Sequence, residues 1–172
     1  PNRALFVDRL GQALLRRDAE VVAIVGLDRF RGINEAYGHS FGDRLLVEVA
    51  RRLERTVARG DTVARIGSDE FAVLTHPGVD LLGAVKSVRI PLGQGVDDGG
   101  DPLVPTASVG MRRLDPGEPP DLQLDDALLA LYRAKELGRD RVATFQAGLR
   151  GRASRQVRIG RGLRRAIDQG QL

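Results

Sequence analysis

A short, almost continuously apolar run at Glu20–Leu27 is the feature that most constrains the fold. Its residues are rich in valine and isoleucine and lie between polar segments, which predicts a buried β-strand. A buried strand needs neighbouring strands for its hydrogen bonds and helices to cover its side chains. The rest of the chain therefore has to supply both kinds of element.

The flanking segments alternate between helical and strand patterns. We expect helices at Ala4–Arg17, Phe41–Val57, Val79–Ile90 and from Leu124 to Gly138, and strands at Thr62–Ile66, Phe71–Thr75, Val104–Arg113 and Arg141–Phe145. The strands expected at Thr62–Ile66 and Phe71–Thr75 flank a polar turn, which predicts a hairpin. The embedded order β-α-β-β-α-β predicts an α+β fold with a ferredoxin-like core, in two layers with helices covering the sheet.

Composition and charge exclude several classes of site. The 172 residues contain no cysteine and two histidines, which excludes disulfides, cysteine nucleophiles and multi-histidine zinc sites. The net charge of +4 comes from residues 150–172, where seven arginines stand beside one acid; the remaining body has 20 basic and 22 acidic side chains. A body built to bind nucleic acid is therefore not supported. No apolar run approaches the length of a membrane span.

The C-terminal segment has the pattern of a connector. We expect residues 1–147 to form the domain and residues 148–172 to form an arginine-rich linker helix toward a downstream domain that is absent here. A solvated arginine-rich helix is the simpler interpretation of the same segment. Because the chain opens with Pro1 and no methionine, we also expect it to be part of a longer protein.

The first cluster of candidate functional residues runs from Asn34 to Asp43. It lies between the buried strand and a helix start, where free N–H groups favour an anionic ligand. Asn34 and Asp43 offer an amide and a carboxylate, a pair able to recognise the donor edge of a purine. A glycine turn with a helix N-cap is the alternative.

Two further clusters carry charge. Gly67, Ser68, Asp69 and Glu70 form the hairpin turn, where adjacent carboxylates repel each other unless a cation is near, so a site for a hard metal ion is plausible. Acidic turns are common, however. Lys135 and Arg139 stand four residues apart near a helix end, where they would share a face and could bind phosphates. A solvated helix end is the alternative for this pair.

Together these segments resemble the GGDEF-domain family, the diguanylate cyclases of bacterial cyclic-di-GMP signalling. The matching stretches, in chain order, are "PNRALFVDRL", "LDRFRGINEAYGHSFGDRLLVEVARRL", "DTVARIGSDEFAVL", "PTASVGMRRL" and "DDALLALYRAKELGRDRVATF". The resemblance covers about residues 1–146. The ending "IGRGLRRAIDQGQL" is similar to the segment that often joins a GGDEF domain to an EAL phosphodiesterase domain.

The resemblance implies a fold, a reaction and roles for particular residues. The fold would be the nucleotidyl-cyclase palm, with a mainly antiparallel central sheet. Two domains would meet as a homodimer, each holding GTP, and condense the two nucleotides with help from Mg²⁺ or Mn²⁺. By position, the residues implied are Asn34 and Asp43 for guanine, Lys135, Arg139, Gly67 and Ser68 for the phosphates, Asp69 and Glu70 for catalysis, and Asp69 and the Leu27 carbonyl for the metal.

Three positions depart from the family pattern. The first aspartate of Asp-x-Asp-x-Phe-Lys, a metal ligand in the family, is replaced by Gly26, and the second signature glycine by Ser68. In the Arg-x-x-Asp motif of the inhibitory product site, Ala58 stands in place of the arginine before Asp61. Asp28 shares a strand face with position 26 and is a candidate substitute ligand, about 7 Å further along the strand.

These departures favour a degenerate GGDEF domain that binds GTP, holds its metal weakly or not at all, and regulates a neighbouring domain. A diguanylate cyclase of low activity is the second reading, and a structural dimerisation module is the third. The resemblance implies covalently adjacent sensory and EAL-type domains and a cytoplasmic domain, and leaves membrane anchoring of the whole protein open.

Overall fold

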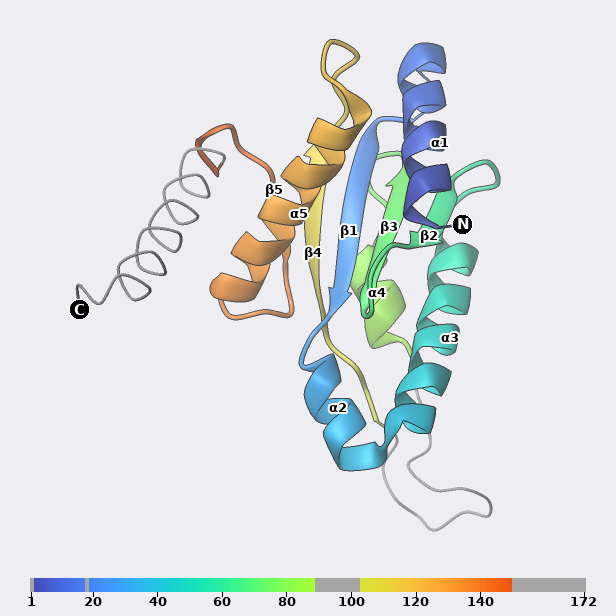
Figure 1. The fold of residues 1–172 in the computed structure, drawn as a ribbon, viewed down its shortest axis with the longest axis vertical. Coiled ribbons are helices and arrows are strands. Elements are labelled where there is room, and N and C mark those ends of the chain that lie inside the picture. Colours follow the sequence, from blue (N-terminus) through green and yellow to red (C-terminus); the bar gives the residue numbers. More distant parts are fainter. Residues whose placement is uncertain (1, 18, 89–102, 150–172) are drawn as a thin grey trace, which may run out of the picture.

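The computed structural model describes residues 2–17, 19–88 and 103–149 (Figure 1). The expected linker helix after residue 149 lies outside the described residues, as does the end of the helix expected at Val79–Ile90. Among the described helices, none is both long and apolar enough to cross a membrane.

A five-stranded sheet forms the centre of the domain, in the order β2-β3-β1-β4-β5. Its strands are β1 (Val21–Leu27), β2 (Thr62–Arg65), β3 (Glu70–Thr75), β4 (Ala107–Arg113) and β5 (Val142–Thr144). The apolar run of the sequence is the middle strand, β1, which pairs antiparallel with β3 and with β4. Only β5 is parallel to its neighbour, β4. The predicted α+β class with a mainly antiparallel sheet is confirmed.

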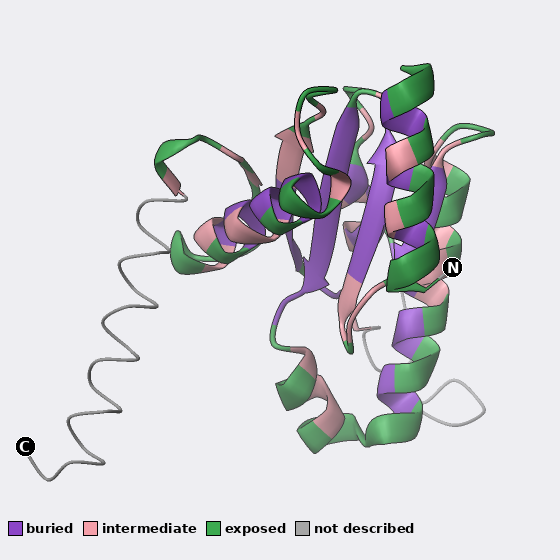
Figure 2. Cartoon of the chain, turned by 45° about the horizontal axis from the view of Figure 1, so that its top comes forward, coloured by how far each residue is buried: buried purple, intermediate pink, exposed green. Residues whose placement is uncertain are grey.

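Helices cover both faces of the sheet (Figures 1 and 2). The helices of the domain are α1 (Arg3–Arg16), α2 (Phe30–Tyr37), α3 (His39–Thr56), α4 (Leu81–Lys86) and α5 (Pro120–Glu136), of which α2 lies beyond the end of β1. Val22 and Ile24 of β1 pack in one core with α1 and α5, whereas Ala23 and Val25 pack in the other with α3 and α4. The expectation of two layers was wrong, because all seven residues of β1 are buried and successive side chains enter opposite cores.

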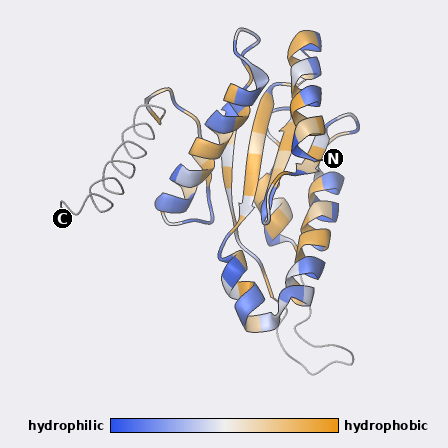
Figure 3. Ribbon diagram, in the orientation of Figure 1, coloured by the Kyte–Doolittle hydropathy of each residue, from blue (hydrophilic) through white to orange (hydrophobic). Residues whose placement is uncertain are grey.

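Helix α2 is the element that the sequence pattern missed. It is eight residues long, none of its residues is fully buried, and it is mostly hydrophilic in Figure 3, so only Phe30 and Ile33 mark its packed side. Gly38, with φ of 82°, separates α2 from α3. The left-handed conformation suits a glycine and lets the second helix start at once in a new direction.

Close packing of α5 on β4 fixes the position of the helix over the sheet. A Cβ atom at Gly110 would overlap the backbone of α5 at Ala127 and Leu131, so the glycine permits direct contact of helix and strand. Further along β4, Arg112 donates hydrogen bonds to the buried Asp126 of α5 and to Glu118. The guanidinium also lies 5.1 Å from the ring centroid of Phe145.

Candidate functional site

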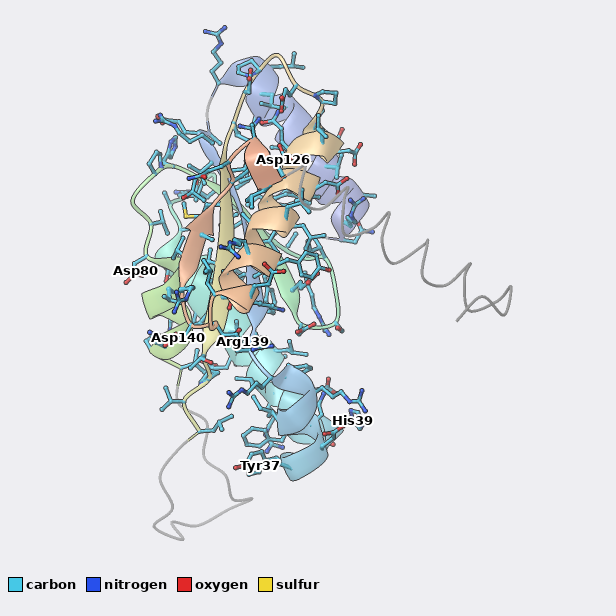
Figure 4. All side chains as sticks on the ribbon, turned by 90° about the vertical axis from the view of Figure 1, so that its left-hand side faces the viewer. Tyr37, His39, Asp80, Asp126, Arg139 and Asp140 are labelled. Carbon is cyan, nitrogen blue, oxygen red and sulfur yellow. The ribbon has the colours of Figure 1, made fainter. Side chains whose placement is uncertain are left out.

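Part of the predicted site lies at the end of the sheet where β1 finishes, whereas Asn34 and Asp43 lie on helices α2 and α3 beyond it. Leu27 donates its backbone N–H to the carbonyl of Asp69 over 3.0 Å, which ties the end of β1 to the turn between β2 and β3. The C-terminal end of α5 lies over the same part of the sheet. Figure 4 shows Arg139 and Asp140 just after α5, and Tyr37 and His39 on the α2–α3 corner beyond the end of β1.

Lys135 occupies the space above Gly26. A Cβ atom built on Gly26 would lie 3.0 Å from Lys135 Nζ and 3.1 Å from Leu131 Cδ2. In the sheet register, Gly26 stands beside Glu70 of β3 on one side and Ser108 of β4 on the other. The position where the family pattern has a metal-ligating aspartate is therefore covered by an ammonium group.

Asp28 is buried, with 4 % of its surface exposed, and both of its oxygens have protein donors. Oδ1 accepts from Ser108 Oγ at 2.8 Å, and Oδ2 accepts from the backbone N–H of Asp140 at 3.0 Å. The Asp140 carboxylate forms an ion pair with Lys86 at 2.9 Å. Strand β1 ends at Leu27, so Asp28 lies just beyond it and joins the end of β1 to β4 and to the turn after α5.

The hairpin turn holds its own polar groups closely. Ser68 Oγ donates to Asp69 Oδ1 over 2.8 Å, and Arg65 donates to the carbonyls of Gly67 and Ser68. A Cβ on Gly67 would lie 3.0 Å from Glu70 Oε2. Burial raises the pKa of Glu70 above its ordinary value; the positive charge of Lys135 opposes this, and the neighbouring carboxylate of Asp69 adds to it.

On the α2–α3 corner, Asn34 lies directly against Gly42. Its Oδ1 is buried and has no hydrogen-bond partner within the described chain, and a Cβ on Gly42 would overlap that oxygen. Asp43 follows Gly42 and is exposed. A buried amide oxygen without a donor is uncommon in a folded protein, and almost none of this oxygen's surface is open to a ligand.

Arg139 is not on α5 as its spacing from Lys135 suggested. The helix ends at Glu136, and the chain then takes positive φ angles of 112° at Gly138 and 64° at Arg139. Arg139 is exposed on this turn. The expectation of a shared helical face is therefore wrong, although both residues lie at the same end of the domain.

Asp28, next to Leu27, and Asp69, the hydrogen-bond partner of Leu27, have protein donors of their own. In the described ranges, no group of three or more histidine, cysteine, aspartate or glutamate side chains is placed to hold a metal ion. Asp69 is bonded to Ser68, Asp28 to two donors of its own, and Lys135 brings a positive charge to the position of the missing ligand.

At the position of the family's inhibitory product site, Asp61 has a local role. Its Oδ2 accepts from the backbone N–H of Ala58 at 2.9 Å and from Thr75 Oγ1 at 2.5 Å. The carboxylate thus stabilises the turn that leads into β2.

The sequence reasoning missed Ser108 and Asp140, whose donors hold Asp28, and the place of Lys135 over Gly26. Ser108 and Asp140 are 80 and 112 residues from Asp28 in the chain. No local motif marks contacts between segments so far apart.

Solved structures share this arrangement of elements. The GGDEF domain of TpbB (YfiN) from Pseudomonas aeruginosa superposes with a TM-score of 0.75 and 30% identity, over 90% of this chain and 95% of that chain. The GGDEF domain of DgcB from Caulobacter crescentus, in complex with c-di-GMP, gives 0.72 and 28% identity, over 83% and 90%. The palm-type fold that the resemblance implied is therefore confirmed.

Sequence relatives agree with the structures. The bifunctional diguanylate cyclase/cyclic di-GMP phosphodiesterase MucR of Pseudomonas aeruginosa is 34% identical over 100% of this chain and 26% of MucR. The cyclic di-GMP phosphodiesterase NbdA of the same species is 34% identical over 98% of this chain and 22% of NbdA. The chain thus spans about a quarter of the length of these relatives. Residues 1–141 match the family described as "Diguanylate cyclase, GGDEF domain", and the chain belongs to this family.

Proposed function

We propose that this chain is a degenerate GGDEF domain that binds GTP and regulates an adjacent domain instead of making cyclic-di-GMP. The observation that carries the proposal is the ammonium of Lys135 above Gly26, 3.0 Å from where a Cβ would stand. Phosphoryl transfer in this family depends on a metal ion that neutralises charge on the phosphates. A site that has a glycine for a ligand and a lysine above it is poorly suited to hold Mg²⁺ or Mn²⁺.

Nucleotide recognition remains supported. Asn34 has an unsatisfied amide oxygen next to Gly42, and Asp43 offers an exposed carboxylate one residue further on. Guanine presents two neighbouring N–H donors that such acceptors could receive. Lys135 and Arg139 at the other side supply positive charge for a triphosphate, with Gly67 and Ser68 as the turn that the phosphates approach.

The partners of this domain follow from the family and from its length. We propose a homodimer, because the family reaction joins two GTP-loaded domains, and an EAL-type neighbour in the same polypeptide. MucR and NbdA, which are named as phosphodiesterases, extend well beyond the part that matches this chain. A sensory domain upstream is proposed on the same ground.

A diguanylate cyclase of low activity is the second candidate. The specific observation in its favour is that Asp69 and Glu70 remain on the turn beside the end of β1, where Leu27 is hydrogen-bonded to Asp69. Losing one direct metal ligand would lower the rate by a factor of about 10²–10⁴, which leaves measurable turnover if a cyclase with the complete metal site is fast.

Two measurements separate the candidates. Calorimetry should show GTP binding more tightly than ATP, and Asp43→Ala should weaken GTP binding while Glu54→Ala, an exposed carboxylate on the same helix, should not. Equal affinity for ATP and GTP would contradict the guanine assignment.

Chromatography of a GTP incubation, with the protein fused to a dimerising segment, should show no cyclic-di-GMP; robust product would favour the cyclase.

A further inference from the structure

We infer that Lys135 replaces the divalent cation as the counter-charge of this site, so that a nucleoside triphosphate binds here without metal. The inference rests on the proposed GTP-binding function and adds to it the ionic form of the ligand: the free triphosphate anion rather than its magnesium complex.

The first support is the position of the ammonium. A Cβ on Gly26 would stand 3.0 Å from Lys135 Nζ and 3.2 Å from Cε, so the end of the lysine fills the space of an aspartate side chain. Leu131, one helical turn earlier on α5, closes the same space with its Cδ2 at 3.1 Å. The glycine thus provides a recess that the lysine end occupies.

The second support is the rigidity of the elements that carry the two residues. Gly26 lies on the middle strand, β1, and is paired with β3 on one side and β4 on the other. Helix α5 lies so close to β4 that Gly110 has no room for a side chain against its backbone. The lysine is thus presented to the end of β1 by a helix that packs directly on the sheet, which suits a fixed counter-charge.

The third support is the state of the acids nearby. Asp28 is held by Ser108 and by Asp140, one oxygen of Asp69 accepts from Ser68, and Glu70 beside Gly26 lies within the electrostatic reach of Lys135. Mg²⁺ prefers near-octahedral oxygen ligands at about 2.0–2.1 Å, and it would meet the repulsion of an ammonium here. A triphosphate meets the opposite: the ammonium attracts its oxygens, and no divalent ion has to be placed first.

Calorimetry with GTP in EDTA and in Mg²⁺ tests this. For the wild-type chain, free GTP should bind in EDTA at least as tightly as in Mg²⁺. Lys135→Met should weaken binding about 10- to 100-fold in both conditions, as expected for the loss of a charge-assisted hydrogen bond. Arg133→Met removes one positive charge from the same helix, where the arginine pairs with Glu136, and should leave the affinity unchanged.

Gly26→Asp provides a second variant whose effect has the opposite sign. Its carboxylate would attract Lys135 and repel the phosphates, so GTP binding should weaken about tenfold in EDTA and recover in Mg²⁺. Far-UV circular dichroism of each variant establishes that it is folded before the comparison is made.

The outcomes separate the two proposals. Wild-type binding that requires Mg²⁺ overturns the inference and leaves the proposed function standing. Tight Mn²⁺ binding by the nucleotide-free wild type, measured by electron paramagnetic resonance, also overturns it. No GTP binding in either buffer contradicts the proposed function, and the inference falls with it.

Discussion

Replacing Asp28 with alanine tests whether this residue fastens the fold or holds a metal. The carboxylate accepts from Ser108 Oγ and from the Asp140 N–H, and it is 4 % exposed. The substitution removes both bonds and leaves the hydroxyl of Ser108, which is fully buried, without its acceptor. It therefore acts on the junction of β1, β4 and the turn after α5.

The size of the effect follows from these two bonds. Hydrogen bonds to a charged group contribute about 1.5–3 kcal/mol each. Asp140 is exposed, so its N–H can bond to water in the variant and the loss there is small. We therefore expect Asp28→Ala to lower the free energy of unfolding by about 3 kcal/mol, which corresponds to a fall in Tm of about 6–12 °C for a chain of this size.

Urea unfolding followed by circular dichroism measures this change. Asp28→Asn is the matched control, because it keeps an acceptor for Ser108 but turns an amide toward the N–H of Asp140; its loss should be about half as large. An alanine variant as stable as the wild type would refute the argument. Stabilisation of the wild type by Mg²⁺ that vanishes in Asp28→Ala would instead identify Asp28 as a metal ligand.

Three further predictions concern the site and its regulation. Gly26→Asp with Ser68→Gly, fused to a dimerising segment, should turn over GTP in Mn²⁺ up to about 10²–10⁴ times faster than the wild type in a chromatographic assay; silence would mean that more than the metal site is lost. Burial raises the pKa of Glu70, so its ionised form destabilises the folded state. Glu70→Gln should therefore be more stable than the wild type at pH 7 in urea titrations, and the gain in stability should shrink as the pH falls toward 4.5. A gain that does not change with pH would refute burial as the cause. Cyclic-di-GMP should not bind tightly at residues 58–61, since Ala58 has no guanidinium and Asp61 is engaged locally; a crystal soaked with the dinucleotide and showing it there would contradict this.

Local patterns predicted most of the fold because its strongest signals are local. The apolar run of β1 gives the central strand, and the polar turn at residues 67–70 gives the hairpin. Helix α2 escaped because it has only eight residues and buries none of them fully, so few apolar positions mark it. The second covering layer escaped because an apolar run marks a strand as buried but does not show on how many faces helices cover it.

The candidate site was predictable in its residues but not in their arrangement. Order and spacing along the chain placed Asn34 and Asp43 in one family motif and Lys135 in another, and the structure puts Lys135 at the end of β1. The contact between Lys135 and Gly26 depends on how closely α5 approaches the sheet. The partners of Asp28 depend on β4 and on the turn after α5. Such contacts between distant segments come from packing, which the sequence pattern does not record.

Arg112 connects the segment that follows β5 with helix α5. The guanidinium is bonded to Asp126 of α5 and lies against Phe145, whose N–H donates to the carbonyl of Met111. A displacement of Phe145 away from β4 would therefore disturb the side chain that attaches α5 to β4. Lys135 lies on the same helix, about two and a half turns beyond Asp126. A movement at Phe145 would therefore reach the ammonium above Gly26 through α5.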